Sequence, residues 1–226
     1  AAARSGRDGK QVTLVGVCKY IGTPLTRLLV EAGCDQLGEN RPQQIWEKAD
    51  QLVGTGAEWH LIGHLQRNKV RRIIPMARMI HSLDSLRLAE EIQVIAEKRD
   101  QVVEVLIQAN ISGERGKHGI APAALGHILE QLDTMINIRP RGMMCMAPAS
   151  TDPETVRPVF ERCREIFDEL CEEPRTSEAF NVLSMGMSGD FEVAIECGAN
   201  VVRVGSAIFG GQEGASSEPE EATTGA

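Results

Sequence analysis

Eight short runs of apolar and β-branched residues recur along this chain, and most are followed by a segment with helical periodicity. Such runs are typical of buried strands, whereas apolar residues spaced three and four apart indicate amphipathic helices. This alternation predicts an α/β domain with a parallel sheet. The strands are expected near residues 12–20, 35–39, 58–63, 79–84, 102–110, 138–146, 180–186 and 201–205.

The number of strands favours a closed barrel. Eight βα units in about two hundred residues match a single (β/α)8 TIM barrel, and an open doubly wound sheet is the alternative. No linker divides the chain, so we expect one barrel domain over residues 11–213. A flexible N-terminus at residues 1–10 and a disordered acidic tail at residues 214–226 are expected to flank it.

Composition excludes several classes of function. A formal net charge of −8 without a basic stripe argues against nucleic acid as a partner. No apolar run reaches the length of a membrane span, and residues 1–10 lack a signal-peptide core. None of the six cysteines forms a C-x-x-C pair, so we expect reduced, structural cysteines and a cytoplasmic protein.

The first strand ends in a lysine, Lys19. The carboxyl ends of barrel strands form the face where such barrels carry their active sites. An amine that loses solvation beside apolar surface becomes a usable nucleophile toward carbonyls. The alternative is a lysine that leaves the core for solvent and has no further role.

The last two strands end in turns rich in glycine and serine, at residues 183–190 and 201–211. Small residues let backbone N–H groups approach an anion closely, and barrels often bind phosphate after strands seven and eight. Two ordinary capped turns are the alternative. Arg203 shares a strand face with Gly205 and can point at the same ligand. Together with Lys19, these turns suit a phosphorylated aldehyde or ketone held as a Schiff base.

A series of motifs in chain order makes the match more specific. They are Val-Gly-Val-Cys-Lys at 15–19, Gly-Glu-Asn at 38–40, Trp-His-Leu-Ile-Gly-His-Leu-Gln at 59–66, His-Ser-Leu-Asp-Ser at 81–85, Lys-His-Gly at 117–119, Leu-Ser-Met-Gly-Met-Ser-Gly-Asp at 183–190 and Arg-Val-Gly-Ser at 203–206. With these motifs the chain resembles the pyridoxal-phosphate homeostasis protein family. That family has the barrel fold of the alanine racemase N-terminal domain.

The resemblance implies that pyridoxal 5′-phosphate (PLP) is held as a Schiff base on Lys19. It also implies that Arg203 faces the pyridine nitrogen, where a guanidinium cannot accept a proton and its charge disfavours one. The cofactor would then be a poor electron sink. The cofactor-binding residues implied are Lys19, Asn40, His60, Met187, Ser188, Arg203, Gly205 and Ser206, with the phosphate at Ser188, Gly205 and Ser206.

The function implied is intracellular PLP (vitamin B6) homeostasis and amino-acid balance, with PLP-dependent apo-enzymes as recipients and no dedicated catalysis beyond a weak racemase-like side activity. A PLP-dependent amino-acid racemase is the alternative, but it needs an acid or base on each face of the substrate carbon. Alanine racemases take one of these from a second domain or subunit, which we do not expect here. A Schiff-base aldolase would leave Arg203 unexplained.

We also expect a monomer without a metal site. His60 and His64 are four residues apart, but they lie in a strand and its loop and lack the glutamate of a helical zinc motif. Asp84, Glu39 and Asp190 need no function beyond capping or solvation.

Overall fold

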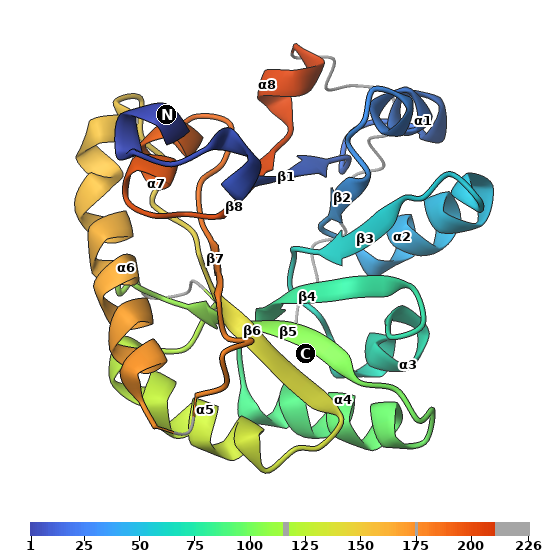
Figure 1. Cartoon of the computed structure of the whole chain (residues 1–226). Coiled ribbons are helices and arrows are strands. Elements are labelled where there is room, and N and C mark those ends of the chain that lie inside the picture. Colours follow the sequence, from blue (N-terminus) through green and yellow to red (C-terminus); the bar gives the residue numbers. More distant parts are fainter. Residues whose placement is uncertain (115–117, 175, 211–226) are drawn as a thin grey trace, which may run out of the picture.

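The computed structural model describes residues 1–114, 118–174 and 176–210. Eight parallel strands pair in sequence order, and β1 pairs with β8 to close the barrel (Figure 1). The predicted (β/α)8 barrel is therefore confirmed, and the open sheet is excluded. The strands are β1 Thr13–Val17, β2 Gln36–Glu39, β3 Glu58–Leu61, β4 Ala77–Leu83, β5 Val103–Ala109, β6 Ile138–Cys145, β7 Val182–Ser184 and β8 Val201–Val204.

Helices cover the outside of the barrel. They are α1 Thr23–Glu31, α2 Pro42–Ala49, α3 Val70–Ile73, α4 Leu86–Glu97, α5 Leu125–Asp133, α6 Arg157–Glu172, α7 Phe191–Glu196 and α8 Ser206–Phe209. Two of the helices are short and adjoin 3-10 turns. The segment at residues 66–74 is a 3-10 turn, Arg67–Lys69, followed by the four-residue α3, and α2 gives way to a 3-10 turn at Asp50–Leu52.

Helix α6 shows how the sequence pattern becomes packing. Its apolar residues recur three and four apart, so they fall on one face and are buried against the sheet. Pro153 opens the preceding 3-10 turn, and the Asp152 side chain accepts a hydrogen bond from the backbone of Glu154 there. The buried stripe consists of Phe160, Cys163, Ile166, Phe167 and Leu170.

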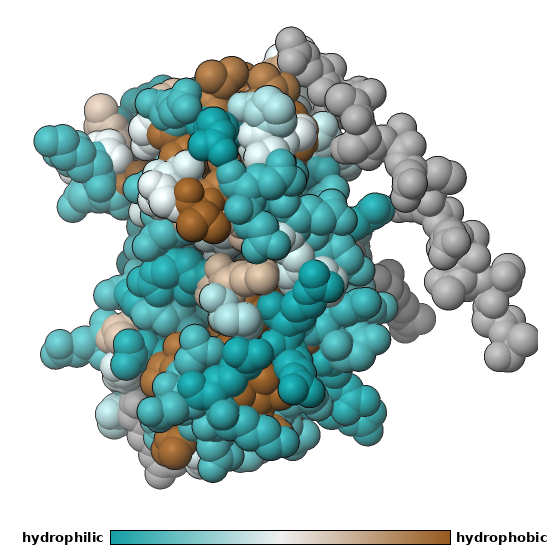
Figure 2. Space-filling model, turned by 90° about the vertical axis from the view of Figure 1, so that its right-hand side faces the viewer, coloured by the Kyte–Doolittle hydropathy of each residue, from teal (hydrophilic) through white to brown (hydrophobic). Residues whose placement is uncertain are grey.

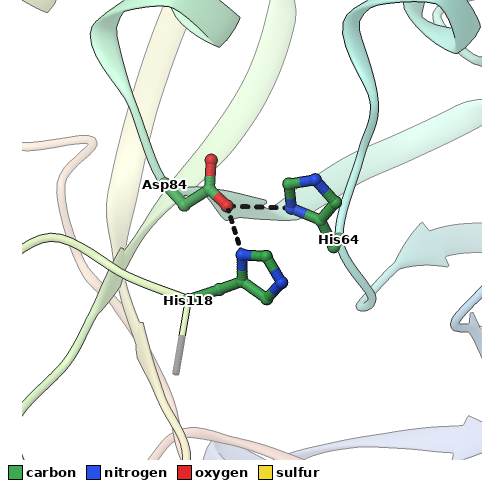
Figure 3. Close-up of side chains that lie close together, drawn as sticks. All are labelled: His64, Asp84 and His118. Atoms are coloured by element: carbon green, nitrogen blue, oxygen red, sulfur yellow. Dashed lines mark hydrogen bonds and ion pairs between the residues drawn. The ribbon is translucent and has the colours of Figure 1, made fainter. Parts of the chain in front are cut away.

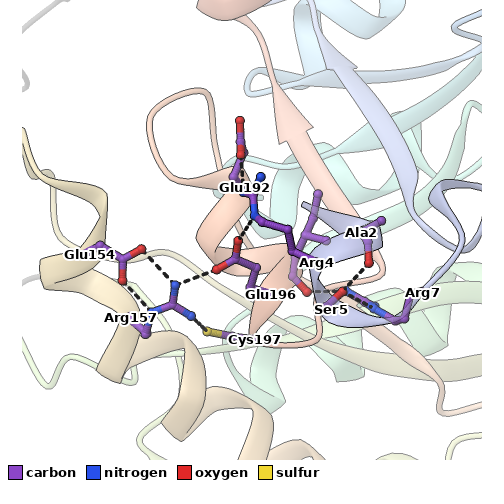
Figure 4. A network of polar contacts seen from close by, with 10 residues as sticks. Ala2, Arg4, Ser5, Arg7, Glu154, Arg157, Glu192, Glu196 and Cys197 are labelled. Carbon is purple, nitrogen blue, oxygen red and sulfur yellow. Dashed lines mark hydrogen bonds and ion pairs between the residues drawn. The ribbon is translucent and has the colours of Figure 1, made fainter.

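The 3-10 turn Ala2–Ser5, within the segment that we expected to be flexible, lies against α7 (Figure 4). Arg4 pairs with Glu192 at 2.5 Å and with Glu196 at 2.7 Å, and Arg7 donates to the Ala199 carbonyl at 2.9 Å. Arg4 and Glu192 are 188 residues apart in sequence, so no local pattern could show this contact. The expected tail at residues 214–226 lies outside the described residues.

The surface is mostly hydrophilic on the side covered by α1 to α3. Figure 2 shows this face, where apolar atoms gather in separate patches. Among the described residues, no helix is long and apolar enough to cross a membrane. All six cysteines are free, and Cys18, Cys145 and Cys163 are buried.

Candidate functional site

A cavity of about 350 Å³ opens at the carboxyl ends of the strands. Its walls come from residues within or just after β1 and β8 and from residues that follow β2, β3, β6 and β7, so the closed barrel brings both ends of the chain to one place. Except for His60, every residue predicted to bind the cofactor lies on its lining. These are Lys19, Asn40, Met187, Ser188, Arg203, Gly205 and Ser206.

Lys19 follows β1 and is half-buried, with its Nζ 4.6 Å from the centre of the Tyr20 ring. The backbone on both sides of it is held by side chains of α2. Lys48 donates to the Cys18 carbonyl at 2.7 Å, and Gln44 donates to the Lys19 carbonyl at 3.2 Å. These bonds fix where the Lys19 side chain leaves the backbone.

Lys48 is itself buried and pairs with the buried carboxylate of Glu39. Burial raises the pKa of Glu39, while the charge and hydrogen bond of Lys48 oppose that rise. This pair could not be predicted, because a lysine nine positions after a strand-end glutamate looks like a solvated helix residue. Glu39 therefore supports the backbone beneath Lys19, whereas a capping or solvated role was expected.

Backbone donors in the turn after β8 converge on one side chain of the turn after β7. The N–H groups of Gly205 and Ala207 both reach Ser188 Oγ, at 3.1 and 3.3 Å. Gly205 also lies so close to β1 that an added Cβ would stand 3.1 Å from the Val17 carbonyl oxygen. Asp190 accepts from the Met187 backbone at 2.6 Å, which makes it the turn cap that the sequence suggested.

Arg203 reaches the cavity from inside the barrel and is buried. It donates to Ser184 Oγ at 2.7 Å and to the Cys145 carbonyl at 2.9 Å. Burial lowers its pKa, but a guanidinium keeps its charge at neutral pH. A fixed positive charge therefore lies at the inner wall of the cavity.

His60 is not on the cavity lining. It lies within β3, ahead of the strand end at Leu61, and its buried ring bonds Gln36 Oε1 at 2.8 Å and His81 Nε2 at 2.8 Å. His81 in turn bonds Ser184 Oγ at 3.1 Å. A continuous chain of side chains thus runs through the barrel from Gln36 to Arg203.

In this series of side chains every hydrogen bond is donated toward Gln36. Burial is the main cause that lowers the pKa of His60 to about 4 and that of His81 well below its usual value, so both rings are neutral at neutral pH. The Gln36 amide nitrogen donates to Asp35 and Glu58, which leaves its oxygen to accept from His60.

The bond between Gln36 and His60 fixes which atom donates in each remaining hydrogen bond of the series. A neutral His60 that donates through Nε2 must accept through Nδ1, so His81 donates to it and accepts in turn from Ser184. Ser184 then accepts from Arg203, which can only donate. The sequence did not reveal His81 or Ser184, because cross-barrel contacts depend on strand register.

Comparison with known proteins agrees with this fold and cavity. Residues 10–213 match the alanine racemase N-terminal domain family. The pyridoxal phosphate homeostasis protein of Aquifex aeolicus is 41% identical over 93% of this chain and 91% of its own length. The chain belongs to the pyridoxal phosphate homeostasis protein family. The resemblance inferred from the motifs is thereby confirmed.

Other members of the pyridoxal phosphate homeostasis family are also similar. The protein of this name from Escherichia coli K12 is 36% identical over 94% of this chain and 91% of its own length. The structure of PipY from Synechococcus elongatus with PLP bound has a TM-score of 0.82 and 31% identity, over 92% of this chain and 97% of that one. An alanine racemase of Clostridium difficile, 16% identical with a TM-score of 0.75 over 89% of this chain and 56% of its own, shares the fold alone.

Proposed function

We propose that this chain binds PLP as a Schiff base on Lys19 and holds it for intracellular PLP homeostasis and amino-acid balance. One observation carries the proposal: a single cavity joins Lys19, the buried Arg203 and the backbone donors that converge near Ser188. The names of the relatives and the PLP-bound PipY structure support it.

The cavity suits this cofactor in size and chemistry. A volume of about 350 Å³ falls within the usual range of small-molecule sites. Gly205 and Ala207 offer two N–H groups to one acceptor, now Ser188 Oγ, and the same donors can serve a phosphate oxygen. We assign the phosphate to Ser188, Gly205 and Ser206.

The aldehyde of PLP supplies a carbon that a primary amine can bind covalently with loss of water. Lys19 is the lysine on the described lining, and Lys48 and Gln44 hold its backbone in place. Asn40 and Met187 complete the walls nearby. We propose that His60 acts on the site only through His81, Ser184 and Arg203, because it is absent from the lining.

The position of Arg203 argues for storage of the cofactor over catalysis. It has five N–H donors, and bonds to Ser184 and Cys145 hold its plane. A permanent positive charge facing the pyridine nitrogen disfavours a proton there, so the ring withdraws electrons weakly. The racemase alternative rests on fold similarity alone.

The decisive test is the visible absorbance of the purified protein and its fixation by borohydride. Wild type should carry PLP that becomes irreversibly attached to Lys19 on reduction. Lys19→Ala should lose the absorbance, whereas Lys98→Ala, which removes the exposed lysine that caps the end of α4, should keep it. Retained absorbance in folded Lys19→Ala would reject the Schiff base.

A second measurement separates storage from turnover. Exchange of the α-hydrogen of D- and L-alanine in heavy water should be very slow with the PLP-loaded protein. Exchange at rates typical of enzymes, about 1–1,000 per second, would favour the racemase.

We further propose that PLP-dependent apo-enzymes receive the cofactor, and that the chain acts as a monomer in the cytoplasm. The six free cysteines suit a reducing compartment. Mixing the loaded protein with an apo-enzyme should restore activity faster than separating them by a dialysis membrane. Light scattering on a sizing column tests the monomer.

A further inference from the structure

Three potential metal ligands from three separate loops meet at the mouth of the barrel (Figure 3). His64 follows β3, Asp84 follows β4, and His118 lies between β5 and α5. His64 Nδ1 is 2.9 Å from Asp84 Oδ2, and His118 Nδ1 is 3.5 Å from the same oxygen. None of the three is on the lining of the Lys19 cavity.

The two imidazole rings stack, with their centres 4.1 Å apart and 17° between their planes. Both rings turn Nδ1 toward Asp84, as Figure 3 shows. One ligand atom from each residue lies within 4.8 Å of the other two. The side chains of His64 and His118 are 42% and 58% exposed, so solvent reaches both rings.

These separations are close to those of a metal site. In a tetrahedral site with bonds of about 2.0–2.1 Å, neighbouring ligand atoms lie about 3.3 Å apart. The two nitrogen–oxygen distances fall on either side of that value. Two imidazoles and one carboxylate form a donor set that suits Zn²⁺ and similar ions, whereas Mg²⁺ and Ca²⁺ prefer oxygen ligands throughout.

We propose that His64, Asp84 and His118 bind one divalent transition-metal ion of the zinc class. The ligand atoms are Nδ1 of both histidines and Oδ2 of Asp84, and water completes the coordination. Each imidazole carries its proton on Nε2 when Nδ1 binds the metal, and the stacked rings splay apart to aim both lone pairs at it.

The site would link three loops at the same rim as the Lys19 cavity. Ile62, two residues before His64, is on the lining of that cavity. The ion would tie the segment before α5 to the ends of β3 and β4. This binding is independent of the proposed role of Lys19, so the two proposals can fail separately.

The test uses the full chain, stripped of metal with a chelator and dialysed against ZnCl2. One Zn²⁺ per chain is expected. His64→Ala, Asp84→Asn and His118→Ala should each weaken binding at least about tenfold. His127→Ala is the matched control, because His127 is also an exposed histidine beside a carboxylate, with Nδ1 3.8 Å from Glu130.

A Co²⁺ spectrum distinguishes this site from one built by cysteines. Nitrogen and oxygen ligands should give weak visible bands, whereas strong near-ultraviolet bands would mean thiolate ligands and overturn the proposal. Equal Zn²⁺ affinity in wild type and in the three folded variants would overturn it as well. Circular dichroism confirms that each variant is folded.

Discussion

Two pairs of histidines lie near the same strands of this barrel, and burial separates them. His60 and His81, the buried pair, are 5% and 0% exposed and bond each other at 2.8 Å. His64 and His118, the mouth pair, are exposed, stack and share Asp84. The buried pair has every ring nitrogen bonded to a neighbour inside the protein, whereas the mouth pair faces solvent.

The difference shows how one side chain serves two purposes. Inside the barrel each imidazole accepts one hydrogen bond and donates another, so every bond between Arg203 and Gln36 is donated in the same direction. At the rim the same group is free to turn and to bind an ion. The contrast predicts that changes to the buried pair cost stability, whereas changes to the mouth pair cost little.

The largest effect is expected from His81→Ala. It removes one hydrogen-bond partner from each of two buried groups, His60 Nδ1 and the Ser184 hydroxyl, and opens a cavity. We expect a loss of about 4 kcal/mol in the free energy of unfolding, measured in urea. A loss below about 1 kcal/mol would mean that the hydrogen-bonded side chains from Gln36 to Arg203 contribute little to stability.

Acid should destabilise the protein through the buried pair. The pKa of His60 falls from 6.5 to about 4 on folding. Between these two pH values, His60 is therefore protonated in the unfolded protein and neutral in the folded protein. The contribution of His60 to stability is therefore fully present above pH 6.5 and is lost as the pH falls toward 4, by roughly 2.5 kcal/mol at pH 4.5.

A comparison of His60→Gln with wild type between pH 6.5 and 4.5 isolates the part due to His60, because His81 and Glu39, whose pKa values are also shifted, are present in both proteins. Glu104, Glu154 and Glu196 have pKa values lowered from 4.5, so their contributions are lost mainly below that pH. His60→Gln should show a shallower slope of stability against pH in this window. A slope equal to that of wild type would contradict the assignment, and an NMR titration of His60 measures its pKa directly.

Ser184→Ala tests the link to Arg203. The hydroxyl accepts from Arg203 and donates to His81, so its removal breaks two buried bonds. We expect a loss of about 1–2 kcal/mol in the free energy of unfolding. Ser82→Ala is a matched control, because Ser82 is buried but makes one bond, 2.6 Å from the Gly63 carbonyl, and should cost less.

Much of the fold and of the cavity could be predicted from the sequence, for a local reason. Strand ends show in short apolar runs, and closure of the barrel brings those ends to one rim, so Lys19 and Ser206 meet across nearly the whole chain. The hydrogen-bonded side chains from Gln36 to Arg203 could not be predicted, because their contacts depend on the pairing register of the strands. Strands β3, β4 and β5 pair with irregular register, which decides whether His60 reaches His81.

The mouth histidines escaped prediction for a related reason. In the sequence the nearest histidine to His64 is His60, four residues away. In the structure the side chains beside His64 are Asp84 and His118, which lie on later loops. Loop positions carry no periodicity, so nothing in the sequence placed these three side chains together.

The smallest effect is expected at the mouth pair without metal. His64→Ala and His118→Ala remove exposed side chains and should change the free energy of unfolding by about 0.5 kcal/mol or less. With Zn²⁺ at 100 times its dissociation constant, wild type should gain about 2.7 kcal/mol, while the two variants gain little. Thermal unfolding with and without ZnCl2 measures both numbers. A variant whose free energy of unfolding rises with Zn²⁺ as much as that of wild type would mean that the mouth histidines hold no ion. The two pairs of histidines would then not differ in metal binding.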